Sequence, residues 1–218
     1  MKIFIDSADV KEIYECFETG FVSGVTTNPS LIKRSGRKPD DVYRELISMG
    51  VEDISMEVVG SQQEMMQETE RLVGIFGTES TTIKIPCTPD GLQVCRYLRR
   101  EGIRTNVTLI FSAAQAILAA KADASYASVF VGRCDDNSVA GLEVVRSVAE
   151  VYGRQGVRTR VLSASIRDVY KVTRSFYNGA HIVTIPPAIF HKMYNHVLTD
   201  AGMQIFNRDA GLPENLGL

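Results

Sequence analysis

The chain of 218 residues with a formal net charge of −2 has the composition of an ordinary globular domain. Its length suits one domain, and 44% hydrophobic with 23% charged residues excludes disordered, collagen-like and coiled-coil classes. The charge balance supplies no basic field for nucleic acid, and no apolar run approaches the roughly 18 residues needed to span a membrane. Four cysteines without a C-x-x-C pair predict reduced thiols, and Asp6 comes too early for a signal peptide, so we expect a cytoplasmic protein.

Short β-prone runs alternate with helix-length segments along the whole chain. We predict strands at residues 2–6, 22–27, 53–58, 81–85, 104–110, 126–131, 160–164 and 181–185. The helical segments between and after them cover residues 8–18, 39–49, 61–76, 89–101, 112–122, 138–154, 166–178 and 187–196. This alternation predicts an α/β protein with one closed (β/α)₈ TIM barrel over residues 1–196. A doubly wound open sheet is the alternative, although no G-x-G-x-x-G follows the first strand.

Residues 197–218 lie beyond the eighth unit. Apolar side chains at roughly helical spacing predict an extra helix over 197–207, and the glycines and proline of 209–218 indicate a tail. The apolar face of this helix is expected either to cover a neighbouring subunit or to fold back on its own barrel.

In a closed barrel, alternate residues of each strand face the surrounding helices and the barrel axis. Aliphatic residues occupy one face of six predicted strands, and their opposite faces carry Phe4, Asp6, Thr26, Asn28, Ser55, Glu57, Thr82, Lys84, Asn106, Thr108, Ser128 and Phe130. Burying charged groups without partners costs several kcal/mol each. Polar residues on so many inward faces therefore predict an active site inside the barrel.

Taken singly, several of these residues have simpler interpretations. Lys84 is compatible with an edge-strand lysine, Asp6 with a helix cap, and Asn28-Pro29-Ser30 with a turn followed by a cap. Asp135-Asp136 is expected in a solvated loop. The histidines are not at zinc spacing and, like the cysteines, are assigned to packing or the surface, so no metal site is predicted.

Lys84, Asp6 and Glu57 together are suited to carbonyl chemistry. An amine enclosed by apolar barrel walls is disfavoured as an ammonium ion and becomes a nucleophile that forms a Schiff base with a ketone or aldehyde. The iminium withdraws electrons from the adjacent carbon, so a C–C bond can break while the two carboxylates move protons. Near the ends of the later strands, three side chains are suited to a phosphate group: Arg133, Ser165 and Arg167. These residues predict a metal-free class I aldol enzyme for phosphorylated sugars.

Local strings of the chain resemble those of the transaldolase family. In chain order they are IDSAD from Ile5, GVTTNPSLI from Gly24, IKIP from Ile83, NVTLIFS from Asn106, FVGR from Phe130 and ASIR from Ala164. The likeness extends from about residue 3 to residue 187. The short chain resembles the small branch of the family, which also contains fructose-6-phosphate aldolases. The resemblance implies a (β/α)₈ barrel, a Schiff-base lysine on the fourth strand, and no cofactor.

Carried over to matching positions, the resemblance implies a role for each residue. Lys84 is the nucleophile, Asp6 the acid/base at the C4 hydroxyl, and Glu57 with Thr108 positions a water for proton transfer. The groups that resemble the family's substrate-binding residues are Asn28, Asn106 and Ser128 for the dihydroxyacetone hydroxyls, Thr26 beside Asp6, and Arg133, Ser165 and Arg167 for the phosphate.

The resemblance implies transfer of a dihydroxyacetone unit from fructose 6-phosphate or sedoheptulose 7-phosphate to an aldose phosphate, in the non-oxidative pentose phosphate pathway. The aldolase branch typically has Tyr where Phe130 stands and Gln where Glu57 stands, so transfer is favoured over fructose 6-phosphate cleavage, the alternative. A non-catalytic sugar-phosphate-binding barrel is disfavoured by the complete polar set. The small branch usually forms rings, so we expect a homo-oligomer, a pentamer or decamer, that binds neither nucleic acid nor membranes.

Overall fold

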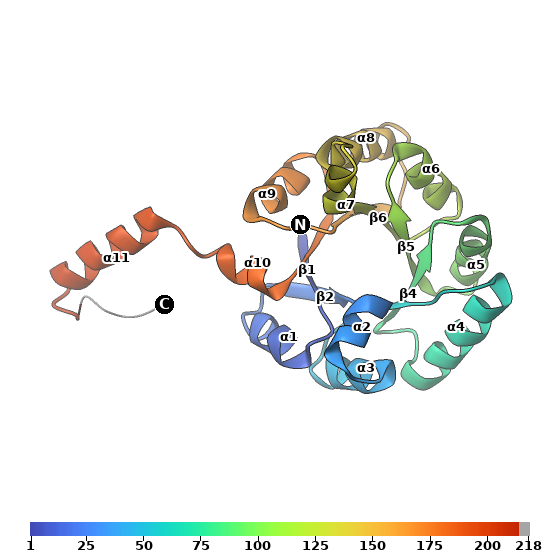
Figure 1. The fold of residues 1–218 in the computed structure, drawn as a ribbon, viewed down its shortest axis with the longest axis horizontal. Helices are drawn as coiled ribbons and strands as arrows, with labels where there is room; N and C mark the ends of the chain where they lie inside the picture. The colour runs from blue at the N-terminus through green and yellow to red at the C-terminus, as the bar shows by residue number, and fades with distance from the viewer. Residues whose placement is uncertain (214–218) are drawn as a thin grey trace.

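The computed structural model describes residues 1–213. Eight parallel strands pair in chain order, and the last pairs with the first to close a barrel (Figure 1). The strands are β1 (Lys2–Asp6), β2 (Val22–Thr26), β3 (Ile54–Glu57), β4 (Thr81–Pro86), β5 (Arg104–Ile110), β6 (Tyr126–Phe130), β7 (Arg160–Ala164) and β8 (Ile182–Ile185). The predicted (β/α)₈ barrel is confirmed, and the doubly wound alternative is wrong because the sheet has no open edge.

Helices surround the barrel, and each predicted helical segment contains one. They are α1 (Val10–Phe17), α2 (Pro29–Ser35), α3 (Pro39–Ser48), α4 (Gln62–Phe76), α5 (Pro89–Arg100), α6 (Ala113–Lys121), α7 (Val131–Asp136), α8 (Gly141–Arg154), α9 (Val169–Tyr177), α10 (Pro187–Lys192) and α11 (Val197–Asp209). At the start of many of these helices a side chain accepts a hydrogen bond from a backbone N–H of the first turn. Each such cap contributes about 1 kcal/mol to stability. The capping residues at the site end of the barrel are Asp9, Asn28, Ser61, Thr88, Ser112 and Asp168.

Helices α2 and α7 are absent from the sequence prediction. Asn28 itself caps α2 by accepting the Leu31 N–H at 2.9 Å, and Pro29 occupies the first turn, so the proposed turn at these residues is wrong. The expected solvated loop at Asp135-Asp136 is also wrong, because both residues belong to α7. Helices of this length are too short to show a hydrophobic period in the sequence.

Two apolar layers follow from the predicted alternation. Between strands and helices lie the aliphatic residues predicted to face outward, among them Ile5, Val25, Ile54, Met56, Ile83, Ile85, Val107 and Val129. A smaller cluster fills the barrel axis with Phe4, Tyr126, Phe130, Leu162, Ala164 and Ile182. Gly24 makes room for Phe4, since a Cβ there would lie 2.8 Å from the Phe4 ring. These large side chains fill the barrel axis toward the amino ends of the strands, so the polar inward groups gather at the carboxyl ends.

Helix α11 confirms the predicted extra helix and extends away from the barrel (Figure 1). It does not fold back on its own barrel, so its apolar side chains remain exposed, including Val197, Leu198, Ile205 and Phe206. Part of the predicted tail, residues 214–218, lies outside the described residues. Across residues 1–213, no helix combines the length and apolarity needed to traverse a membrane.

Candidate active site

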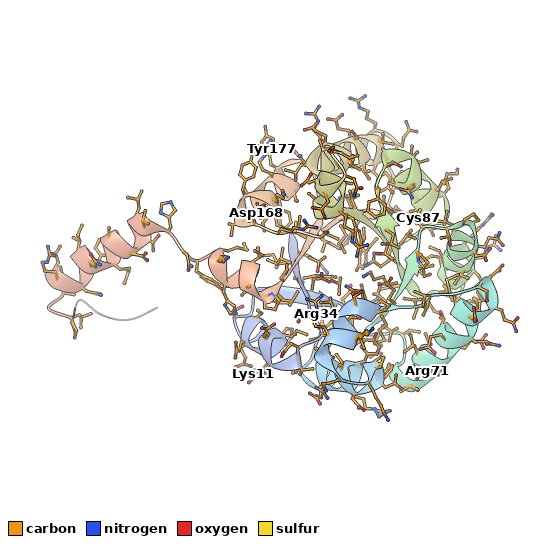
Figure 2. The ribbon with its side chains drawn as sticks, viewed as in Figure 1. Lys11, Arg34, Arg71, Cys87, Asp168 and Tyr177 are labelled. Atoms are coloured by element: carbon orange, nitrogen blue, oxygen red, sulfur yellow. The ribbon has the colours of Figure 1, made fainter. Side chains whose placement is uncertain are left out.

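A cavity of about 80 Å³ opens at the carboxyl ends of the strands. In (β/α)₈ enzymes this end of the barrel carries the chemistry. The lining residues are Asp6, Thr26, Asn28, Lys84, Ser128, Phe130, Arg133, Ala164, Ser165 and Thr184. Figure 2 shows how densely side chains fill the barrel around this axis, whereas Arg71 and Tyr177 lie on its outer surface. The structure therefore brings together most of the side chains that the strand pattern and the family resemblance indicate.

Lys84 lies at the cavity wall in direct contact with Glu57. The two residues are register partners on β4 and β3, and Lys84 Nζ is 2.9 Å from Glu57 Oε2. The amine also donates to the carbonyl oxygen of Thr27 at 2.8 Å, and Lys84 is only 4% exposed. The expectation of purely apolar walls around the amine is therefore wrong. The contact with Glu57 is an ion pair and that with Thr27 a hydrogen bond that the amine donates, and an ammonium ion has to give up a proton before its nitrogen can attack a carbonyl carbon.

Asp6 reaches the same cavity from the end of β1. Burial raises the pKa of Asp6 above its ordinary value, although the charge of Lys84 and the hydrogen bond from Thr26 oppose this shift. Thr26 Oγ1 donates to Asp6 Oδ1 at 2.7 Å, so the hydroxyl of Thr184, 2.7 Å from Thr26 Oγ1, is the donor in that second bond. A carboxyl with a raised pKa is suited to taking up and releasing a proton during a reaction.

Asn106 connects the cavity wall to the barrel interior. Its Oδ1 accepts from Ser128 Oγ at 2.6 Å, and its Nδ2 donates to Ser55 Oγ at 3.1 Å. Asn106 and Thr108 are both completely buried and do not line the cavity. Thr108 Oγ1 on β5 has no hydrogen-bond partner among residues 1–213, but the same holds for Thr81 Oγ1, at the first residue of β4. The unpaired hydroxyl of Thr108 therefore does not by itself mark a functional group.

Two backbone positions beside the cavity are strained. Leu109 on β5 and Ser165 after β7 have φ angles of 58° and 59°. Such conformations cost a non-glycine residue about 1–3 kcal/mol and often accompany function. Ser165 is held by the N–H of Gly132, which donates to its carbonyl oxygen at 3.0 Å. A Cβ on Gly132 would lie 2.2 Å from that oxygen, so only glycine lets α7 approach the loop after β7.

The predicted phosphate-binding residues differ in their placement. Arg133 lines the cavity, with its guanidinium 4.9 Å above the centre of the Phe130 ring, and Ser165 lines it too. Arg167 does not line it, because its two terminal nitrogens donate to the Asp136 carboxylate at 2.5 Å each. This pairing holds the pKa of Asp136 below its ordinary value. Arg133 and Ser165 can therefore meet an anion directly, whereas Arg167 has to exchange partners first.

Sequence reasoning missed Thr184 and Ala164 as site residues, and it placed Ser55 inward without giving it a role. Thr184 lines the cavity and supports Thr26, and Ser55 supports Asn106. Both missed residues lie on β7 and β8, outside the six strands whose alternation predicts the inward residues. On β8, Val183 and Ile185 pack toward the helices, so the same pattern places Thr184 inward.

Histidines and cysteines have structural contacts away from the cavity. His181 Nδ1 accepts from the Val161 N–H at 3.1 Å, His196 caps α11, and Cys16 Sγ lies 3.7 Å from His191 Nε2. All four cysteines are free. Within residues 1–213, no group of three or more His, Cys, Asp or Glu side chains is placed to hold one metal ion.

The chain is similar to known proteins along nearly its whole length. The model of the family described as Transaldolase/Fructose-6-phosphate aldolase matches residues 3–213. A relative from Paracoccus denitrificans named "Probable transaldolase" is 47% identical over 210 residues, which cover 96% of each chain. A relative of the same name from Geotalea uraniireducens is 48% identical over 210 residues, 96% of this chain and 97% of its own. The chain therefore belongs to the transaldolase/fructose-6-phosphate aldolase family.

Proposed function

We propose that the protein is a class I transaldolase that moves a dihydroxyacetone unit from a ketose phosphate to an aldose phosphate. The observation that carries this proposal is the buried Lys84 amine, 2.9 Å from the Glu57 carboxylate and in one cavity with Asp6 and Arg133. The name shared by the full-length relatives supports transferase activity.

The first stage joins Lys84 to the substrate. Glu57 takes a proton from the ammonium ion, and the nitrogen lone pair forms a bond to the ketose carbonyl carbon while the carbonyl oxygen gains a proton. Loss of that oxygen as water leaves a positively charged iminium. The 2.9 Å contact lets Glu57 act in both proton transfers.

The second stage breaks the C3–C4 bond. The Asp6 carboxylate accepts the proton of the C4 hydroxyl, the bond electrons move into the iminium to form an enamine, and the aldose phosphate leaves as an aldehyde. An acceptor aldose then enters, and the same steps in reverse form the new bond. Because burial raises the pKa of Asp6, its protonated form is accessible when the proton has to be returned.

Hydrogen bonds already present decide which groups are free to hold the dihydroxyacetone unit. Asn28 Oδ1 accepts from the Leu31 N–H, which leaves the amide NH₂ of Asn28 to donate to a substrate hydroxyl. Asn106 is bonded through both amide atoms, so it acts by orienting Ser128. Arg133 and Ser165 hold the phosphate at the cavity, where charge-assisted bonds from an arginine are strong.

Phe130 favours transfer over simple cleavage. Its ring lines the cavity beneath Arg133 and has no hydroxyl with which to activate water against the enzyme-bound unit. Fructose-6-phosphate aldolase activity is the alternative within the family, and it differs by releasing free dihydroxyacetone when no acceptor is present.

Borohydride trapping tests the proposal. Reduction in the presence of fructose 6-phosphate should attach a three-carbon unit to Lys84, seen as a mass shift of its peptide, and Lys84→Ala should abolish both adduct and transfer. An unmodified Lys84 peptide would refute the mechanism. A coupled assay with and without erythrose 4-phosphate separates the alternatives: product only with acceptor supports transfer, product without it indicates cleavage, and binding without turnover indicates a non-catalytic barrel.

A homo-oligomer, a pentamer or decamer in the cytoplasm, belongs to the same proposal. Val197, Leu198 and Phe206 of α11 are 77%, 73% and 68% exposed, and a neighbouring copy of the chain would bury them. Light scattering on a chain that ends after His196 should give a smaller particle than the full chain. An unchanged mass would refute the role of α11 in assembly.

A further inference from the structure

A second cavity, of about 300 Å³, opens at the end of the barrel opposite Lys84. Tyr126 and Arg160, the first residues of β6 and β7, are register partners, so this cavity faces the amino ends of the strands. Its lining residues are Arg99, Asp123, Ala124, Ser125, Tyr126, Arg158 and Arg160. We call this site the arginine pocket.

The arginine pocket has an excess of positive charge. Arg99 is held by the carbonyl oxygens of Asp123, which accepts from Nε at 2.9 Å, and Ile103, which accepts from Nη1 at 3.2 Å. Arg158 Nη2 lies 3.7 Å from Asp123 Oδ1. The backbone N–H of Arg160 donates to the carbonyl oxygen of Ser125 at 2.9 Å, whereas its guanidinium forms no hydrogen bond or ion pair with any of residues 1–213. Three guanidinium groups therefore line a pocket with a single lining carboxylate, which lies near Arg158 alone. Arg99 is held by backbone carbonyl oxygens that leave its Nη2 free to donate.

Further positive charge surrounds the pocket. Burial lowers the pKa of His181, and the charges of Arg160 and the N-terminal amine add to that shift. Burial and the carboxylate of Asp53 raise the pKa of Tyr126, and the charges of Arg104 and Arg160 oppose that shift only in part. Asp53 also pairs with Arg104 at 3.5 Å, so of these two arginines only Arg160 adds uncompensated charge. Like charges gathered in this way destabilise the fold, and a bound anion relieves their repulsion.

We propose that the arginine pocket binds a small phosphate-containing anion that carries two or more negative charges. This site is separate from the sugar-phosphate cavity. The fork of an arginine matches phosphate oxygens in bidentate geometry, and its charge persists at any physiological pH. Arg99 supplies a fixed donor, Arg160 is unpaired through its side chain, and Arg158 is held only by an exposed ion pair with Asp123, so both can turn toward the ligand. Asp123 limits the excess to two positive charges, which matches a ligand of similar negative charge.

Calorimetric titration with inorganic pyrophosphate at low ionic strength tests this proposal. The wild-type chain should bind at two sites, because Arg133 offers one in the active-site cavity. Arg158→Gln with Arg160→Gln should weaken one site at least about tenfold, the equivalent of one charge-assisted hydrogen bond, and leave transaldolase turnover unchanged. Arg133→Gln should remove the other site only.

Arg146→Gln with Arg154→Gln provides the matched control, since these two arginines are exposed on α8 and do not line either cavity. That variant should keep both sites. Equal pyrophosphate binding by the wild type and the Arg158/Arg160 variant would overturn the proposal, as would a wild type with one site that Arg133→Gln removes. Should the double variant lose its far-UV circular dichroism, Arg160→Gln alone serves, because that side chain has no partner among the described residues.

Discussion

The ion pair between Lys84 and Glu57 makes a quantitative prediction about stability. Their charged atoms are 2.9 Å apart, and the side chains are only 5% and 9% exposed, so solvent screens them little. With an effective dielectric constant of about 20, the Coulomb attraction at this distance is about 6 kcal/mol. Removing water from two ions costs several kcal/mol each, so the intact pair has a small net effect. Glu57→Ala leaves a buried ammonium without its partner and should lower the free energy of unfolding by about 3–5 kcal/mol.

Urea unfolding followed by far-UV circular dichroism measures the effect, with the slope against urea checked for constancy. The double variant Lys84→Met with Glu57→Leu should be nearly as stable as the wild type, because apolar residues of similar volume replace a buried pair at little cost. Glu45→Ala is the matched control: Arg37 and Glu45 are closer still, at 2.5 Å, but their side chains are 35% and 47% exposed. This control should lose far less stability than Glu57→Ala.

Two results would refute this reasoning. In the first, Glu57→Ala is no less stable than Glu45→Ala, which would mean that Lys84 does not depend on its carboxylate neighbour. In the second, the double variant is as unstable as Glu57→Ala, which would place the loss in packing rather than in an uncompensated charge. Either result would also remove the argument that Glu57 is the first acceptor of the Lys84 proton.

Four further predictions concern activity and pH. Asp6→Asn should slow transfer by roughly 10²–10⁴ in the coupled assay. Since burial raises the pKa of Asp6, the folded chain binds this proton more tightly than the unfolded chain, so wild-type stability declines as pH rises above the ordinary value of 3.8. In thermal melts Asp6→Asn should therefore have the higher melting temperature near neutral pH, and the difference from the wild type should shrink as pH falls toward 3.8. A difference that grows as pH falls would show that the pKa of Asp6 is shifted in the opposite direction. Phe130→Tyr should increase aldehyde release from fructose 6-phosphate without an acceptor, and no increase would contradict the role given to the phenyl ring. Asp136→Asn should free Arg167 for phosphate and lower KM several-fold at similar kcat, whereas a higher KM would identify Asp136 as the residue that positions Arg167.

Local pattern was sufficient for the barrel and for much of the cavity. Strand side chains alternate with a period of two, so an aliphatic face on β4 or β6 leaves Lys84 and Ser128 on the other face whatever the rest of the fold does. Eight successive strand–helix units are the number that a (β/α)₈ barrel needs, and the strands pair in chain order until the last meets the first. The short helices α2 and α7 escaped prediction because they are too short to show a hydrophobic period. The adjacent Asn28 caps α2, and ion pairs with the distant Arg167 and Lys171 stabilise α7.

The sequence by itself therefore determined the strand and helix order, the inward residues and the chemistry that a lysine with two carboxylates favours. Only the tertiary structure decided the contacts between units: Glu57 on the Lys84 amine, Asn106 behind Ser128, and Arg167 on Asp136. It also decided that Arg99, Arg158 and Arg160 meet at one cavity. Each of these contacts joins residues far apart in the chain or on neighbouring strands. Whether such residues come into contact depends on strand register, barrel closure and helix packing, and no local sequence pattern specifies these.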